Sequence, residues 1–190
     1  LGNLDMSQAK TEEMLPGEYA RSGLKRGLEF EQKLGVNPYK FGQVGSTDSH
    51  TSLPAVEEEN FFGKHSGVEP SPERAMHVTL GGEHGKIMGY QMASSGYAAV
   101  WATENTRQAI FDAMARRETY ATTGSRMLVR FFGGWEFTEE DAQTRLPAQK
   151  GYQKGVPMGG DLNKAPEGKA PTFLVAALKD ALSGNLDRIQ

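Results

Sequence analysis

The chain has 190 residues, of which 37% are hydrophobic, and it contains 23 glycines and nine prolines. The length allows one domain with a buried core, and the glycine and proline content predicts many loops. The formal net charge of −3, with no basic stripe, argues against nucleic-acid binding. The absence of cysteine excludes disulfides and thiolate metal ligands. The sequence contains no run of 18 apolar residues, so no membrane span is predicted.

The first half of the chain predicts a helix, a short strand and a long loop region. A helix is expected over residues 17–34, because Pro16 suits its entry and Gly35 its end. Residues 41–44 are expected to form a short strand. Residues 51–98 show no clear periodicity, which in a compact domain is typical of a functional segment. A brief strand, or the lead-in to a helix, is expected over residues 98–102.

The second half predicts one strong helix followed by strands. The helix is expected over residues 105–117, with Asn105 or Thr103 as its N-cap. Residues 138–169 are interpreted as a polar insertion. Strands are expected over residues 119–123, 127–132, 172–178 and 182–190. The order favours an α/β fold with a β-rich C-terminal part.

Asp48 and His50 are the first candidates for a functional site. They follow the expected strand 41–44, and two residues that are two positions apart in a strand point to the same side. An oxygen and a nitrogen ligand aimed at one point can hold a divalent metal such as Zn, Mn or Fe. The alternative is a turn at Asp48 followed by a surface histidine.

All four histidines lie within residues 50–84, so any chemistry is expected there. His65 is a candidate metal ligand or general acid, and the alternative is a loop histidine beside an aromatic anchor. His77 and His84 lie in a glycine-rich segment, where a loop position is favoured over a functional role. The acidic run at residues 57–59 is most simply a solvated face, although one member could face the site.

Two arginines are candidates for binding an anionic substrate. Arg107 and Arg126 could each clamp a phosphate or carboxylate with a guanidinium group. The alternatives are a helix-surface ion pair for Arg107 and a strand-edge charge for Arg126. The sequence contains no Walker-type phosphate loop and no Gly-x-Ser-x-Gly elbow.

Three stretches of the chain resemble the bacterial family known as domain of unknown function 3604. They cover residues 27–42, 45–64 and 95–122, and the second begins with Gly-Ser-Thr-Asp-Ser-His. That family is similar to the polymerase-and-histidinol-phosphatase (PHP) superfamily of metal-dependent hydrolases. The resemblance implies a distorted β/α barrel that hydrolyses a phosphoester or related ester with a metal-activated water. It also implies that Asp48 and His50, matching a late Asp-x-His of the superfamily, are metal ligands.

The resemblance further implies how the chain is organised. Such barrels take their first ligands from an early His-x-His, which these 190 residues lack. The chain is therefore expected to be the C-terminal portion of a longer protein, with a piece of the barrel at residues 1–125 and a β-rich appendage at residues 126–190. The expected partner is a small-molecule ester, in the bacterial cytoplasm or periplasm. The rival hypothesis is a non-catalytic binding or structural domain in which residues 127–190 form an interaction module.

Overall fold

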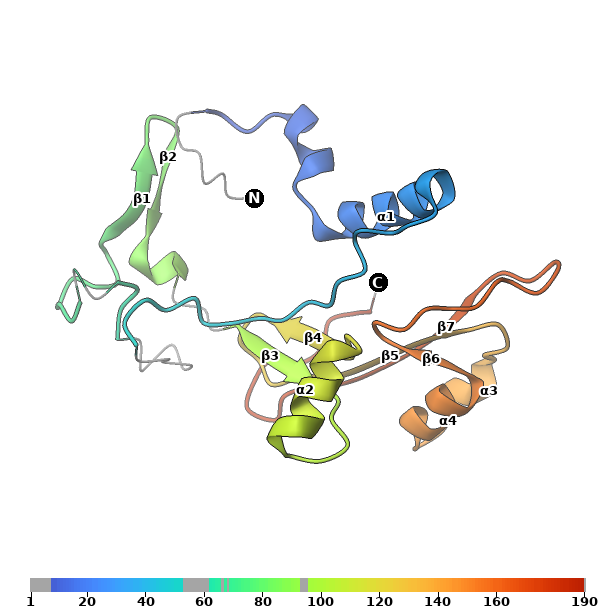
Figure 1. Cartoon of the computed structure of the whole chain (residues 1–190). Coiled ribbons are helices and arrows are strands. Elements are labelled where there is room, and N and C mark those ends of the chain that lie inside the picture. The colour runs from blue at the N-terminus through green and yellow to red at the C-terminus, as the bar shows by residue number, and fades with distance from the viewer. Residues whose placement is uncertain (1–7, 53–61, 66, 68, 93–95, 190) are drawn as a thin grey trace. The chain divides into compact units, whose positions relative to one another are not determined.

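The computed structural model describes residues 8–52, 62–65, 67, 69–92 and 96–189 (Figure 1). The chain divides into two compact units. The first unit contains the described parts of Leu1–Phe41 and Thr47–Ser95, and the second contains Gly42–Ser46 and the described parts of Gly96–Gln190. The expected boundary between residues 125 and 126 falls inside the second unit.

The first unit contains one long helix. A 3-10 helix, η1 (Glu12–Gly17), precedes α1 (Ala20–Leu34), which confirms the helix expected from the sequence. Gly35 ends α1 with φ of 77°, in the left-handed region that glycine adopts without strain, and its N–H donates to Glu31 O at 2.9 Å. Gly27 is buried in α1, and a β-carbon there would lie 2.2 Å from the Asn37 side chain. The helix therefore ends and turns back where the sequence indicates.

The first unit also contains a β-hairpin inside the region expected to be loop-rich. Strand β1 (Val78–Gly82) pairs antiparallel with β2 (Gly85–Met88), and the 3-10 helix η3 (Gly89–Met92) follows. Gly82 lies opposite Gly85, so a two-residue turn joins the strands. The sequence predicted a loop-rich segment over residues 51–98 and did not predict this hairpin.

The second unit contains two small antiparallel sheets. In one, β3 (Tyr97–Val100) pairs with β4 (Thr119–Thr122), and α2 (Arg107–Ala115) joins them. The other has the order β6 (Gly155–Pro157), β5 (Leu128–Gly134) and β7 (Thr172–Leu178). The helices α3 (Glu139–Ala142) and α4 (Pro147–Lys154) lie between β5 and β6 in the chain. Phe132, Phe137 and Leu174 form the buried apolar core of this unit, with Ala148 of α4 packed against them.

Several elements of the second unit confirm the sequence predictions. They are β3, α2, β4, β5 and β7. The N-cap of α2, however, is Thr106 rather than Asn105 or Thr103, since its Oγ1 accepts a hydrogen bond from the Ala109 N–H at 3.3 Å. The expected strand over residues 182–190 was wrong for the described residues 182–189, where Leu182 is 98% exposed and has no strand to pair with.

The fold is a mixed α/β arrangement of small antiparallel sheets and helices. The described elements form no β/α barrel, because every pair among the named strands is antiparallel. The part after residue 126 is mixed rather than β-rich. Its expected polar insertion contains α3, which a Thr138–Asp141 capping box begins, and α4, which starts with Pro147.

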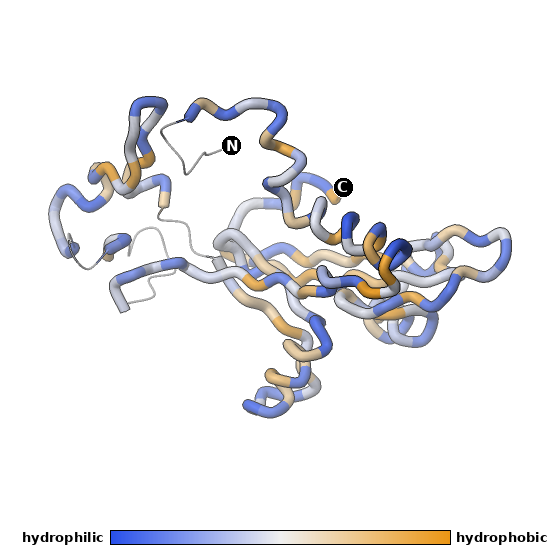
Figure 2. The backbone as a smooth tube through the Cα atoms, turned by 45° about the horizontal axis from the view of Figure 1, so that its top comes forward, coloured by the Kyte–Doolittle hydropathy of each residue, from blue (hydrophilic) through white to orange (hydrophobic). Residues whose placement is uncertain are grey.

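Apolar and polar residues alternate along the helices of both units (Figure 2). None of the described helices is long and apolar enough to cross a membrane.

Candidate functional site

The segment that leads to the candidate site is extended but is not a strand. The expected strand over residues 41–44 was wrong, since none of the described strands pairs with this segment. A β-carbon on Gly42 would lie 2.7 Å from Thr119 Oγ1, and one on Gly45 would lie 2.6 Å from Tyr97 O. Only glycine lets this segment pass so close to β3 and β4. Its end is fixed by the Gly96 N–H, which donates to Ser46 O at 2.9 Å.

A turn, rather than a strand, brings the Asp48 and His50 side chains together. Asp48 has φ of 50°, in the left-handed region that aspartate tolerates better than most residues. The Ser49 N–H donates to Thr47 Oγ1 at 3.2 Å and holds the turn. Asp48 Oδ1 then lies 3.3 Å from His50 Nε2. The pairing expected from the sequence is present, although the strand geometry used to predict it is not.

Lys64 holds the other side of the Asp48 carboxylate. Its Nζ lies 2.8 Å from Asp48 Oδ2 and also donates to the Asp48 backbone carbonyl. The Lys64 side chain is 7% exposed, whereas that of Asp48 is 70% exposed. The hydrogen bond from Lys64, and then its charge, lower the pKa of the Asp48 carboxyl below its ordinary value. Asp48 is therefore held as an anion in a fixed position.

His65 lies beside His50. The His50 N–H donates to Lys64 O at 2.9 Å, and His50 and His65 form an isolated parallel β-bridge. Their ring centroids are 4.8 Å apart with an interplanar angle of 48°. The structure thus brings together three residues that the sequence predicted as functional, namely Asp48, His50 and His65. The acidic run at residues 57–59 lies outside the described residues.

The Asp48–His50 pair fits two corners of a metal site. Two ligands that each lie about 2.0–2.1 Å from a tetrahedral Zn²⁺ are about 3.3–3.4 Å apart. The 3.3 Å between Asp48 Oδ1 and His50 Nε2 matches that separation. Across the described part of the chain, however, no group of three or more His, Asp or Glu side chains could hold a metal ion. The described residues therefore supply a pair of ligands and not a full set.

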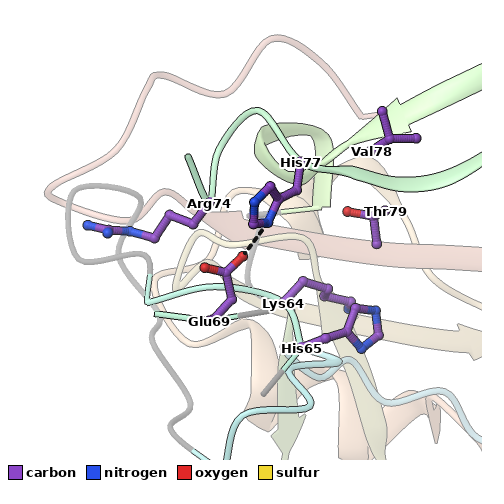
Figure 3. A pocket seen from close by; sticks show the side chains of 7 residues that line it. All are labelled: Lys64, His65, Glu69, Arg74, His77, Val78 and Thr79. Atoms are coloured by element: carbon purple, nitrogen blue, oxygen red, sulfur yellow. Dashed lines mark hydrogen bonds and ion pairs between the residues drawn. The ribbon is translucent and has the colours of Figure 1, made fainter. Parts of the chain in front are cut away.

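A cavity of about 410 Å³ lies in the same unit as this pair (Figure 3). Its lining residues are Lys64, His65, Glu69, Arg74, His77, Val78 and Thr79. Figure 3 shows the Glu69 carboxylate facing the His77 ring, with Glu69 Oε1 and His77 Nδ1 3.3 Å apart. The Glu69 side chain is 2% exposed, and its Oε2 has no hydrogen-bond partner in the described part of the chain. A buried carboxylate and an imidazole thus line one cavity.

Glu69 was not predicted as a site residue from the sequence, and a loop position was favoured for His77. One sequence signal near Glu69 is Gly63, which has φ of 143°. A β-carbon on Gly63 would lie 2.0 Å from Glu69 Cγ, so glycine is required for the carboxylate to occupy its position. The sequence Gly63-Lys64-His65 does not by itself indicate that Gly63 lies against the Glu69 side chain.

The two candidate arginines lie in the second unit. Arg107 is the first residue of α2 and is exposed. The Arg126 N–H donates to Asp180 Oδ2 at 2.7 Å, and its guanidinium lies 5.5 Å from the centroid of the Tyr97 ring. These contacts give Arg126 a structural role in joining the ends of β3 and β5 to the segment after β7. They do not test a role in binding substrate.

A second cluster of charges is buried in the second unit around Glu118. The Glu118 side chain is 3% exposed and accepts hydrogen bonds from Arg116 Nε, at 2.9 Å, and from Tyr152 Oη. Burial, and then the hydrogen bond to Glu118, raise the pKa of Tyr152. The Arg130 guanidinium lies 3.2 Å above the centroid of the Trp101 ring. Because its groups satisfy one another, we interpret this cluster as part of the packing of the unit.

The fold and this site define the class of protein: a mixed α/β protein with a carboxylate–imidazole pair and, in the same unit, a cavity lined by both charged and apolar groups. The chain belongs to the family described as protein of unknown function (DUF3604), whose model matches residues 1–190. No curated protein and no solved structure matches the chain.

Proposed function

We propose that the chain contributes Asp48 and His50 to the divalent-metal site of a hydrolase that acts on a phosphoester or a related ester. The observation that carries this proposal is the 3.3 Å separation of Asp48 Oδ1 and His50 Nε2, which suits two ligands of one metal ion. The ionised state of Asp48, which Lys64 favours, supplies the charge that a cation needs. The PHP-like barrel that the sequence resemblance implies belongs to this proposal.

A Zn, Mn or Fe cation held there would lower the pKa of a water molecule and polarise the ester. Residues of the chain would position the carboxylate ligand and supply the proton. Lys64 holds the Asp48 carboxylate in place through two hydrogen bonds. His65, whose ring lies beside that of His50, would donate a proton to the leaving group. The remaining metal ligands are assigned to residues other than those described.

The test measures metal binding by the purified chain. The chain is dialysed against Zn²⁺, Mn²⁺ or Fe²⁺, and the bound metal is quantified by elemental analysis. We expect one ion to bind the wild-type chain and to be lost in Asp48→Ala/His50→Ala. His84→Ala, in the turn of the β1–β2 hairpin, is the matched control and keeps the metal. Absence of metal from the wild-type chain, or its retention in the double variant, contradicts the proposal.

One observation favours a second candidate, a non-catalytic domain in which residues 47–50 are only a turn. Lys64, nearly buried, binds both the backbone carbonyl and the carboxylate of Asp48, which is what a structural turn requires. This candidate predicts no metal binding and a loss of stability in Asp48→Ala. Metal content and thermal unfolding, measured on the same variant, distinguish the two.

A further inference from the structure

Ser71, His77 and Glu69 form a continuous line of hydrogen-bonding groups, in which His77 and Glu69 line the cavity and Ser71 lies on the other side of the His77 ring from Glu69. Ser71 Oγ lies 3.5 Å from His77 Nε2, and His77 Nδ1 lies 3.3 Å from Glu69 Oε1. A nucleophile, a base and a carboxylate that orients the base are the three parts of a catalytic serine site, whichever fold carries them. In a structure without substrate these distances are commonly somewhat long.

The carboxylate sets the tautomer of the imidazole. An ionised carboxylate can only accept hydrogen bonds, so the proton of a neutral His77 is placed on Nδ1, facing Glu69 Oε1. His77 Nε2 is then left with a lone pair facing the Ser71 hydroxyl. The arrangement therefore allows His77 to accept the serine proton.

The backbone of each of the three residues is anchored. Ser71 O accepts hydrogen bonds from Arg74 N, at 3.3 Å, and from Arg74 Nη1, at 2.9 Å. His77 N donates to Glu73 O at 3.1 Å, and His77 O accepts from Gly89 N at 2.8 Å. Fixed positions of this kind are what a relay of proton transfers needs.

Glu69 is anchored as well, by its N–H, which donates to His65 O at 3.1 Å. Its side chain is almost fully buried, and its Oε2 has no hydrogen-bond partner among the described residues. A buried carboxylate oxygen that makes no hydrogen bond costs free energy. Glu69 also belongs to the residues that line the cavity.

We propose that Ser71, His77 and Glu69 form a nucleophilic serine site that cleaves small carboxylic esters without a metal. Ser71 Oγ attacks the carbonyl carbon as its proton passes to His77 Nε2. The bond between that carbon and the leaving oxygen then breaks, and the leaving oxygen takes the proton from His77. Water repeats the sequence on the acyl-serine and releases the acid. Glu69 holds the His77 ring throughout, and Arg74, whose Nη1 donates to Ser71 O at 2.9 Å, supplies positive charge near the serine, where the carbonyl oxygen becomes negative.

The test is labelling of the chain by a fluorophosphonate in the presence of EDTA, followed by mass spectrometry. Ser71 Oγ would form a bond to phosphorus as fluoride leaves and His77 takes the proton. We expect modification at Ser71, its loss in Ser71→Ala, and a labelling rate lowered about 100-fold or more in His77→Gln. Ser183→Ala, which changes an exposed serine in the second unit, is the matched control and keeps the label.

Glu69→Gln keeps the size of the side chain and tests the role of the carboxylate without opening a cavity. We expect slower labelling and a shift in its pH dependence, with circular dichroism of the variant matching that of the wild type. No labelling of the wild type, labelling at another serine, or labelling that does not depend on His77 overturns the proposal. EDTA removes divalent metal ions from solution. Labelling at Ser71 therefore tests the serine site independently of whether Asp48 and His50 bind a metal.

Discussion

Lys64 Nζ lies 2.8 Å from Asp48 Oδ2 and also donates to the Asp48 carbonyl, so one lysine fixes both the side chain and the backbone of the aspartate. The two residues are 16 positions apart in the chain. The ammonium is nearly buried while the carboxylate faces solvent. This leaves the other carboxylate oxygen, Oδ1, directed at His50.

The first prediction concerns the titration of Asp48. Lys64 lowers its pKa in the folded chain, so the stabilising contact is fully present above the unfolded pKa of about 3.9 and is lost as the pH falls through the folded value. Lys64→Met removes the cation, and we expect the Asp48 pKa to rise. NMR of the side-chain carboxyl carbons between about pH 2 and 6 measures the change.

The control for this titration is Lys33→Met, which removes a lysine from the last turn of α1. The Asp48 titration should be the same in Lys33→Met as in the wild type. An Asp48 pKa that does not respond to Lys64→Met would show that the contact between the two residues does not form in solution.

The second prediction concerns the buried charge cluster of the second unit. Glu118→Ala leaves Arg116 and Tyr152 without their shared acceptor, and a hydrogen bond to a charged group contributes about 1.5–3 kcal/mol. Because the Arg116 side chain is 40% exposed and can turn to water, we expect the free energy of unfolding to fall by about 2 kcal/mol. Urea denaturation followed by circular dichroism measures it.

Glu167→Ala, at an exposed position of the same unit, is the control for that loss and should change the free energy of unfolding by less than about 0.5 kcal/mol. Equal stabilities of the Glu118→Ala and Glu167→Ala variants would contradict the role assigned to the cluster.

The third prediction concerns the contact between α4 and β5. A β-carbon on Gly151 would lie 2.3 Å from the ring of Phe132, which is 1% exposed and cannot move aside. The gain in helix propensity from Gly151→Ala is about 1 kcal/mol, and the overpacking costs about 3 kcal/mol. We therefore expect a net destabilisation of about 2 kcal/mol, by the difference of those two terms.

Gly23→Ala is the matched control, because a β-carbon there would come no closer than 3.9 Å to the Phe41 ring. In α1 the gain in helix propensity is not opposed by overpacking, so we expect Gly23→Ala to stabilise the first unit by about 1 kcal/mol. If Gly151→Ala and Gly23→Ala both raised, or both lowered, the free energy of unfolding, the packing of Gly151 against Phe132 would be contradicted.

Local signals were sufficient to predict several elements of the fold. The helix α1 ends at Gly35, which has a positive φ. A glycine directly after a helical pattern commonly marks the end of a helix, so this end could be predicted from the sequence. The strand β7 is a run of apolar residues that pairs along its whole length with β5. Residues 41–44 have a similar local pattern, but a strand also needs a partner, and the sequence does not say which segments meet.

Prediction of the candidate site was limited in the same way. Asp48 and His50 are two positions apart, and the single turn at Asp48 is enough to bring their side chains together. Lys64 lies 16 positions after Asp48 in the chain, and Glu69 reaches His77 through the turn before β1. Contacts of this kind depend on how the loops fold, and no periodicity in the sequence indicates them.

The stacking of Arg130 on Trp101 has a practical consequence for studying the two units separately. The sequence contains two tryptophans, Trp101 and Trp135, and both belong to the second unit. Intrinsic tryptophan fluorescence therefore monitors the unfolding of that unit, where an indole in contact with a guanidinium should change its emission when the stack opens. Damage confined to the unit that carries Asp48, Glu69 and Ser71 would leave this signal unchanged, so a normal emission spectrum cannot certify that a site variant is folded.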